Sequence, residues 1–285
     1  MALQISHSHP LPPAKKSLGQ CFLVERQYAC EIVQALGICA GDTVIEIGPG
    51  RGILTEELVQ TPARVIAVEI DQRLIDPLLS KYGTQANFSL RHEDFLDTDF
   101  SQIIGSGTAK VVGNLPYHLA AEVTYKLLIH ARAARDNLEM PWIETAVLMM
   151  QKEVAERIAS KPGRKAWGKL SVFAQLEAQT SYMLSVPAGA FRPIPKVDGG
   201  VVRMDFYRLP PWRPLNYQVL ERIVRWTFHQ RRKMLKKSLS SLSGVHPHWM
   251  AAGLDATRRP ETLSPEEWVM LADTVAQAQK EREQK

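Results

Sequence analysis

The sequence contains no apolar run long enough to span a membrane, and only three of its 285 residues are cysteines. Cys21, Cys30 and Cys39 are odd in number and form no Cys-x-x-Cys pair. They therefore indicate neither a disulfide framework nor a zinc site. We expect no metal centre and a reducing, cytoplasmic environment.

Several common signatures of nucleotide sites and of protein export are also missing. The chain has no Gly-x-x-x-x-Gly-Lys-Ser/Thr loop and no His-x-Glu followed by Cys-x-x-Cys, the signature of zinc deaminases. Residues 1–16 contain proline, histidine and lysine but no apolar core, so they do not resemble a secretory signal. We expect them to form a flexible tail.

Acidic residues are fewer than basic ones, 30 against 35, and the net charge of +5 with a pI near 9.1 favours an anionic partner. No acidic residue follows Glu221 until well after residue 237. We interpret the basic run as a phosphate-binding face, the alternative being a solvated helix face. Its cations are Arg222, Arg225, Arg231, Arg232, Lys233, Lys236 and Lys237.

Short apolar, β-branched segments alternate with amphipathic helical segments over much of the chain. This alternation predicts an α/β fold with a doubly wound parallel sheet. The alternating pattern of Val201–Tyr207 favours a last, antiparallel strand at the sheet edge. The expected strands are Thr43–Ile47, Arg64–Val68, Asn87–Leu90, Ala109–Gly113, Thr145–Met150, Tyr182–Val186 and Val201–Tyr207.

A proline-rich, stiff segment, Leu209–Pro214, separates this pattern from a purely helical one. We therefore expect an α/β domain over residues 17–208 and a small all-helical domain over residues 209–285.

The tetrapeptide Asn114-Leu115-Pro116-Tyr117 follows the strand 109–113, at the sheet edge where open α/β proteins bind ligands. The Asn114 amide oxygen and the Leu115 carbonyl can both accept hydrogen bonds from an exocyclic amine. Pro116 restricts the backbone so that these acceptors can converge, and Tyr117 offers a face for stacking a splayed-out base. The alternative is a simple turn that ends the strand.

An adenine N6 amine is a substrate that needs such a pair of acceptors. Its lone pair is delocalised into the ring, and two acceptors that hold its hydrogens favour a pyramidal nitrogen aimed at an incoming methyl group. These hydrogen bonds strengthen as positive charge develops on nitrogen. They therefore stabilise the transition state more than the ground state.

Earlier strand ends carry features of a site for an adenosyl cofactor. Gly48-x-Gly50-x-Gly52 lets backbone amides approach a ligand, although its spacing differs from the dinucleotide motif. Glu69, about twenty residues further on, is suited to binding ribose hydroxyls. Asp94 can accept from an adenine amino group, and the neighbouring Phe95 can pack against the ring.

These segments resemble, in one order, the motif series of the ribosomal RNA adenine N6,N6-dimethyltransferases. The resemblance extends from about Lys16 to Leu242, and the leucine at position 115 favours the small-subunit branch of the family. The matching segments are Glu46–Thr55, Val68–Asp71, Glu93–Phe95, Asn114–Tyr117, Gln151–Val154, Phe191–Asp198 and Phe228–Lys233.

The resemblance implies a Rossmann-like sheet that uses S-adenosylmethionine as methyl donor. The implied target is two adjacent adenosines in the 3′-terminal hairpin loop of small-subunit (16S) rRNA. The cofactor-binding residues that follow are Cys21, Leu23, Gly48, Gly50, Glu69, Asp94 and Asn114.

Position 21 departs from the family pattern. The family motif reads Gly-Gln-Asn-Phe-Leu, whereas this chain has cysteine in place of the asparagine. A thiol is a weaker hydrogen-bond partner than an amide. A contact made by the side chain would be weakened here, and a contact made by the backbone would be kept.

Further residues are expected to contact the RNA. We expect Phe191 to stack on the flipped base opposite Tyr117, the alternative being a core phenylalanine. Lys196 is expected to contact phosphate, and Arg231-Arg232-Lys233 resembles the RNA-docking helix of the family.

We expect a monomeric, cytoplasmic enzyme of ribosome biogenesis that acts on small-subunit rRNA in an immature subunit, with no membrane partner. Two alternatives remain open. One is an adenine methyltransferase that acts on large-subunit rRNA or DNA with the same tetrapeptide. The other is a non-catalytic ribosome-assembly or transcription factor with the same fold.

Overall fold

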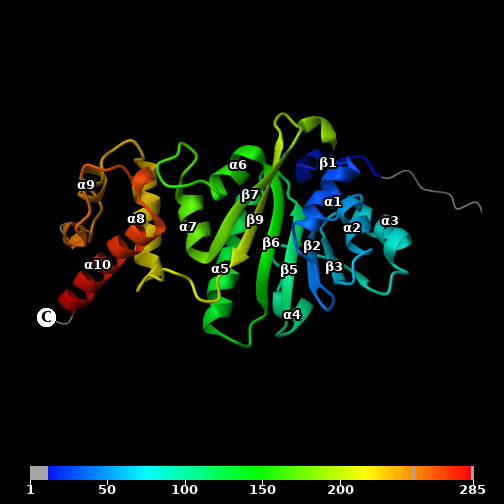
Figure 1. Ribbon diagram of the computed structural model, residues 1–285, viewed down its shortest axis with the longest axis horizontal. Helices are drawn as coiled ribbons and strands as arrows, with labels where there is room; N and C mark the ends of the chain where they lie inside the picture. Colours follow the sequence, from blue (N-terminus) through cyan, green and yellow to red (C-terminus); the bar gives the residue numbers. More distant parts are fainter. Residues whose placement is uncertain (1–11, 246–247, 284–285) are drawn as a thin grey trace, which may run out of the picture. The chain divides into compact units, whose positions relative to one another are not determined.

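The computed structural model describes residues 12–245 and 248–283, which divide into two units (Figure 1). The first unit contains the described residues up to 155 together with 181–206. The second contains the described residues of 156–180 and of 207 onward. Within the described part of the chain, no helix combines the length and the apolar character needed to cross a membrane.

The first unit is built on a sheet with the strand order β4-β3-β2-β5-β6-β9-β7. Strands β2 to β6 pair in parallel, and β9 pairs antiparallel with β6. This arrangement confirms the predicted doubly wound sheet. Its central strands β2, β3, β5 and β6 are mostly buried, as parallel strands are when helices cover both faces of a sheet. The strands are β2 Thr43–Ile47, β3 Arg64–Glu69, β4 Phe88–His92, β5 Thr108–Asn114, β6 Trp142–Gln151, β7 Ala178–Val186 and β9 Gly199–Phe206.

The position predicted for the last strand is wrong. β9 was expected at the sheet edge, but β6 lies on one side of it and β7 on the other. β7 occupies the edge, and its side chains between the two buried end residues alternate between exposed and half-buried. Strand order depends on contacts between distant segments, and the alternation of β9 did not carry that information.

Helices and one short strand pair complete the first unit. α1 and α2 pack on the sheet through a shared apolar cluster that includes Ile32 and Leu58. A two-stranded ladder joins β1 to β8, with Leu23 opposite Phe191. The elements are η1 Lys16–Leu18, β1 Phe22–Leu23, α1 Arg26–Gln34, α2 Ile53–Leu58, α3 Gln72–Tyr82, α4 Phe100–Ile104, α5 Ala120–Asp136, η2 Ala188–Ala190 and β8 Phe191–Arg192. The division between the two units falls within α6, Lys152–Ile158.

The second unit is helical and has a core of its own. Trp167 and Trp268 are fully buried in one cluster with α8 and α10. The side-chain amide oxygen of Asn216 caps α8 by accepting from Gln218 N and Val219 N at 2.9 and 3.1 Å. The helices are α7 Lys169–Glu177, α8 Tyr217–His229, α9 Leu235–Leu239, η3 His248–Ala252, η4 Pro260–Thr262 and α10 Pro265–Glu283.

The observed units differ from the expected domains in residues 156–180 and at the N-terminal tail. The change to the helical unit after residue 206 lies near the expected boundary, but residues 156–180 also join the second unit. They do so because Trp167, Val172 and Leu176 complete its apolar core. Of the expected tail 1–16, residues 1–11 lie outside the described residues. Pro12 and Pro13 accept hydrogen bonds from arginine side chains of the first unit, so this part is not a free tail.

Candidate active site

A cavity lies at the carboxyl ends of β2, β3 and β5. Every residue predicted to bind the cofactor or to act in catalysis lines it, although these residues come from six separate segments. The parallel pairing explains this convergence, because the carboxyl ends of neighbouring parallel strands meet at one edge. The predicted residues on its wall are Cys21, Leu23, Gly48, Gly50, Glu69, Asp94, Asn114, Leu115, Pro116, Tyr117 and Phe191.

The glycine turn after β2 has a backbone that other residues rarely adopt. Gly48, Gly50 and Gly52 have φ values of 60°, 60° and 82°. A Cβ at Gly50 would approach the Phe22 ring at 3.0 Å, and one at Gly52 would lie 2.6 Å from the Tyr82 ring. A Cβ at Gly48 would meet no protein atom within 4 Å. The turn is therefore packed behind Gly50 and Gly52 and open at Gly48, which lines the cavity.

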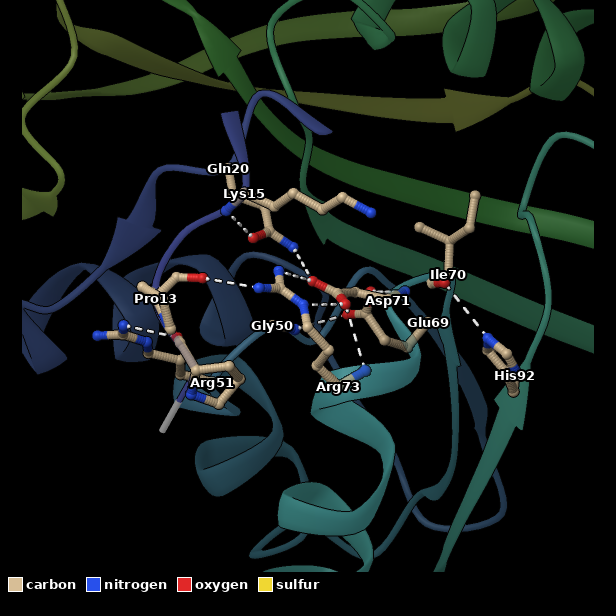
Figure 2. A network of polar contacts seen from close by, with 11 residues as sticks. Pro13, Lys15, Gln20, Gly50, Arg51, Glu69, Ile70, Asp71, Arg73 and His92 are labelled. Atoms are coloured by element: carbon tan, nitrogen blue, oxygen red, sulfur yellow. Dashed lines mark hydrogen bonds and ion pairs between the residues drawn. The ribbon is translucent and has the colours of Figure 1, made fainter. Parts of the chain in front are cut away.

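Glu69 ends β3 as a buried carboxylate, with only 3% of its surface exposed. Its Oε2 accepts from Gly50 N at 3.0 Å and its Oε1 from Asp71 N at 2.8 Å (Figure 2). Burial raises the pKa of Glu69, and these backbone donors oppose that shift. Each oxygen keeps a further lone pair, so the carboxylate can also accept from hydroxyl groups of a ligand.

Glu46 is a second buried acid, which the sequence did not single out. It is fully buried in β2, where Thr55 Oγ1 donates to its Oε2 at 2.7 Å. Within the described part of the chain its Oε1 has no hydrogen-bond partner. Burial raises its pKa to about 8.

We expect Glu46→Gln to flatten the pH dependence of stability. The wild-type carboxyl is neutral when folded below about pH 8, whereas it ionises near its ordinary pKa when unfolded. Its stabilising contribution is thus complete below the unfolded pKa and is lost as pH rises through about 8. The loss is on the order of a few kcal/mol. Thermal unfolding of the wild type and of Glu46→Gln, measured from acidic to alkaline pH, gives the pH dependence of stability. Glu122→Gln, at an exposed position, is the control. A steep, wild-type-like decline in Glu46→Gln would contradict this assignment.

Gln20 and Asp71 hold residues 18–23, called the entry segment below, against the sheet. The sequence did not reveal this role. Gln20 Nε2 donates to Asp71 Oδ2 at 2.8 Å, while its Oε1 accepts from Lys15 N at 2.7 Å (Figure 2). Asp71 also caps α3, and the guanidinium of Arg73 lowers its pKa to about 2. Aspartate immediately before a helix was the available signal in the sequence.

Asp94 and Phe95 belong to a turn that Lys126 holds. Asp94 Oδ1 accepts from Leu96 N at 2.8 Å. Lys126 Nζ, from α5, donates to the carbonyls of Leu96 and Thr98 at 2.8 and 2.6 Å. Desolvation by burial lowers the pKa of Lys126. No local pattern in the sequence points to this lysine, because its partners are backbone atoms about thirty residues away.

The Asn114 side chain is oriented by the entry segment. Its Nδ2 donates to the Cys21 carbonyl at 3.1 Å, which leaves Oδ1 on the opposite branch of the amide. Leu115, the residue after Asn114, is fixed to β6 because its backbone N donates to Met149 O at 2.9 Å. A Cβ at Gly113 would lie 2.8 Å from the Ile47 carbonyl, so glycine is needed for β5 to pass this close to β2.

The family pattern has asparagine where this chain has Cys21, and the contact between Cys21 and Asn114 shows whether this replacement affects Asn114. The contact is made by the backbone carbonyl of Cys21, which any residue type supplies. Burial raises the pKa of the Cys21 thiol, so the side chain remains a neutral, small group. Cysteine at this position therefore leaves the orientation of Asn114 intact.

The rings of Tyr117 and Phe191, both expected to stack on the target base, differ in how far they are exposed. Tyr117 is half-buried, its hydroxyl donates to Val197 O at 3.3 Å, and burial raises its pKa to about 12. Phe191 also lines the cavity, but only 1% of its surface is exposed and it packs in the sheet core. The structure therefore favours a core role for Phe191 over an open stacking face, since its pairing with Leu23 in the β1–β8 ladder holds it inside.

Comparison with known proteins assigns the chain to a family. A family model described as ribosomal RNA adenine dimethylase matches residues 13–277. The ribosomal RNA small subunit methyltransferase A of Pseudomonas aeruginosa is 40% identical over 265 residues, covering 93% of this chain and 95% of that protein. The chain belongs to the ribosomal RNA adenine dimethylase family. The enzyme of the same name from Xanthomonas euvesicatoria is 38% identical over 266 residues, or 92% and 96% of the two chains.

Solved structures share the fold of this adenine dimethylase. A dimethyladenosine transferase from Plasmodium falciparum superposes with a TM-score of 0.71 and 23% identity, covering 88% of this chain and 95% of that one. The 23S rRNA methyltransferase ErmE gives a TM-score of 0.68 and 26% identity, covering 90% and 99%. The predicted family, fold class and enzymatic nature are thus confirmed.

The predicted RNA contacts of the dimethylase lie outside the cavity. Lys196 is exposed on the loop that follows β8. Arg231, Arg232 and Lys233 were expected on a helix, but they lie in the turn between α8 and α9. Arg231 donates to Glu261 Oε2 at 2.8 Å and to the Lys165 carbonyl at 2.6 Å. Its charge is therefore paired within the second unit, whereas Arg232 and Lys233 remain exposed.

Proposed function

We propose that this protein transfers methyl groups from S-adenosylmethionine to the N6 amines of two adjacent adenosines in the 3′-terminal hairpin loop of small-subunit rRNA. The observation that carries the proposal is the Asn114 amide, which the Cys21 carbonyl orients at the wall of the cavity. The names of the relatives, which are small-subunit rRNA methyltransferases, support the choice of target.

The cavity fits an adenosyl cofactor. Gly48 leaves open space where a side chain would project, and the buried Glu69 carboxylate offers acceptors for ribose hydroxyls. Asp94 has one oxygen held by Leu96 N, and its other oxygen suits an adenine amino group. When bound, S-adenosylmethionine would supply an electrophilic methyl group on a sulfonium.

The residues of the chain position the target amine. In the proposal, Asn114 Oδ1 and the Leu115 carbonyl accept the two N6 hydrogens and direct the nitrogen lone pair. Both contacts strengthen as the nitrogen becomes positive, so they lower the barrier. Tyr117 stays protonated and stacks on the base. The methylated nitrogen releases its proton to water, so the proposal assigns no residue as general base.

Lys126→Met is expected to weaken S-adenosylmethionine binding by about tenfold, the scale for losing a charged hydrogen bond. The reason is that Lys126 holds the turn that carries Asp94. Calorimetric titration measures the change, with the exposed Lys81→Met as control. An unchanged affinity would show that the turn keeps its shape without the lysine.

The substrate assignment is tested by supplying three acceptors to the purified chain. We expect methyl transfer into small-subunit particles whose target adenosines are unmethylated, and none into naked large-subunit rRNA or duplex DNA. Mass mapping of the product should find the methyl groups on two adjacent adenosines. Transfer into another acceptor would change the assigned substrate. Absence of S-adenosylmethionine binding would favour a non-catalytic assembly factor.

The proposal includes a monomer that acts in the cytoplasm on an immature small subunit. The exposed side chains of Arg232 and Lys233 in the second unit support an RNA partner, since exposed cations attract phosphate.

A further inference from the structure

The loop between β8 and β9 exposes apolar side chains beside the target site. Ile194 is 64% exposed and Val197 is 46% exposed. Single exposed apolar residues are common on protein surfaces. These two lie three positions apart in a short loop, and the loop contacts Tyr117 of the tetrapeptide.

Both ends of this loop are anchored. Phe191 is buried at its start, within the β1–β8 ladder. At its end, Asp198 accepts from Lys152 N through its carbonyl and from Ala188 N through Oδ1, each at 3.0 Å. The Val197 carbonyl accepts from the Tyr117 hydroxyl at 3.3 Å. Ile194 therefore projects from a fixed base whose position is tied to the residue that would stack on the substrate.

Charges next to Ile194 favour a nucleic acid as the partner of this loop. Arg192 and Lys196 lie two positions on either side of it, and both are exposed. Arg192 Nη1 donates to the carbonyls of Gly189 and Phe191, each at 2.8 Å, and these neutral acceptors hold the guanidinium without cancelling its charge. Within the described part of the chain, Lys196 forms no ion pair. Cations that flank an apolar side chain match RNA, in which phosphates surround apolar base faces. Isoleucine is one of the apolar side chains that proteins insert between base steps, and its β-branch restricts χ1.

We propose that Ile194, supported by Val197, occupies the space in the RNA stack that the target adenosine leaves when it enters the cavity. This inference rests on the proposed function. Extrusion of a base costs the energy of its stacking contacts. An apolar side chain that packs against the uncovered face of the neighbouring base restores part of that contact. Ile194 thus lowers the energetic cost of moving the target base out of the RNA stack, whereas Asn114 and Leu115 hold the amine of that base.

The test compares Ile194→Ser with Ile129→Ser, an equally drastic change at a 54% exposed residue of α5. One readout is kcat/KM for small-subunit particles, and another is the fluorescence of 2-aminopurine at the target position, which rises when the base leaves the stack. We expect Ile194→Ser to lower kcat/KM by about tenfold and to reduce the fluorescence rise, while Ile129→Ser changes neither. S-adenosylmethionine affinity should stay at the wild-type value.

A second substrate separates base extrusion from general RNA binding. In RNA that carries an abasic residue next to the target, there is no neighbouring face to cover, and the difference between wild type and Ile194→Ser should vanish. A defect that persists on this RNA would overturn the proposal, as would equal rates on the natural substrate. If the wild-type chain methylates neither RNA, the proposed function itself fails and the inference falls with it.

Discussion

Replacing Asn114 with alanine is expected to lower kcat by about a hundredfold, the scale for losing one transition-state hydrogen bond. The amide is oriented by the Cys21 carbonyl at 3.1 Å and would hold the N6 amine through Oδ1. Because this contact strengthens during the reaction, its loss should act on turnover far more than on cofactor affinity. Single-turnover methyl transfer and calorimetry together measure the two effects.

Two further variants sharpen this experiment. Asn114→Asp keeps the shape but removes the donor to the Cys21 carbonyl, so we expect a loss of turnover of similar order. Asn137→Ala, at the C-terminal end of α5, is the control for an asparagine away from the cavity. A turnover number of Asn114→Ala close to that of the wild type would exclude the role assigned to the amide.

Replacing Arg232 and Lys233 together with glutamine is expected to weaken RNA binding and to flatten its salt dependence. Both side chains are exposed in the turn after α8. Each phosphate contact to single-stranded RNA contributes about 0.7 to the slope of log affinity against log salt, so the pair should lower the slope by up to about 1.4. Fluorescence anisotropy between roughly 50 and 200 mM salt measures it.

Arg231→Gln is the matched control from the same turn. Its ion pair with Glu261 at 2.8 Å and its bond to the Lys165 carbonyl use the guanidinium within the protein. We therefore expect Arg231→Gln to keep the wild-type salt slope and to change the melting temperature slightly, as is usual for a partly exposed pair. If Arg231→Gln flattened the slope as much as the double variant, Arg231 would also contact phosphate.

The fold and most of the cavity wall could be predicted because they depend on short-range patterns. Buried β-branched runs identified the strands, and parallel strands bring their carboxyl ends to one edge. Glu69 and Asn114 are the last residues of β3 and β5, Asp94 comes two residues after β4, and all three line one cavity. The identity of each residue and its place after a strand were enough to bring the site together.

Other features depended on contacts that no local pattern records. Lys126 stabilises a turn about thirty residues away by donating to backbone carbonyls. Every residue has a backbone carbonyl, so the residue types in the turn do not reveal this contact. Phe191 could be an open stacking ring or a core ring until its ladder with Leu23 buried it. In the sequence Arg231 looked like Arg232 and Lys233, and its contacts with Glu261 and with the Lys165 carbonyl distinguish it from them.

The sequence by itself determined the order of the strands along the chain, the chemistry at their ends and the family. Periodicity and residue type act locally, and they decide which side chains reach the edge of a parallel sheet. Only the tertiary structure decided which way the Asn114 amide points, which rings are open and which cations are unpaired. Those properties arise from distant segments that pack together, because burial and hydrogen-bond partners are set by the whole fold.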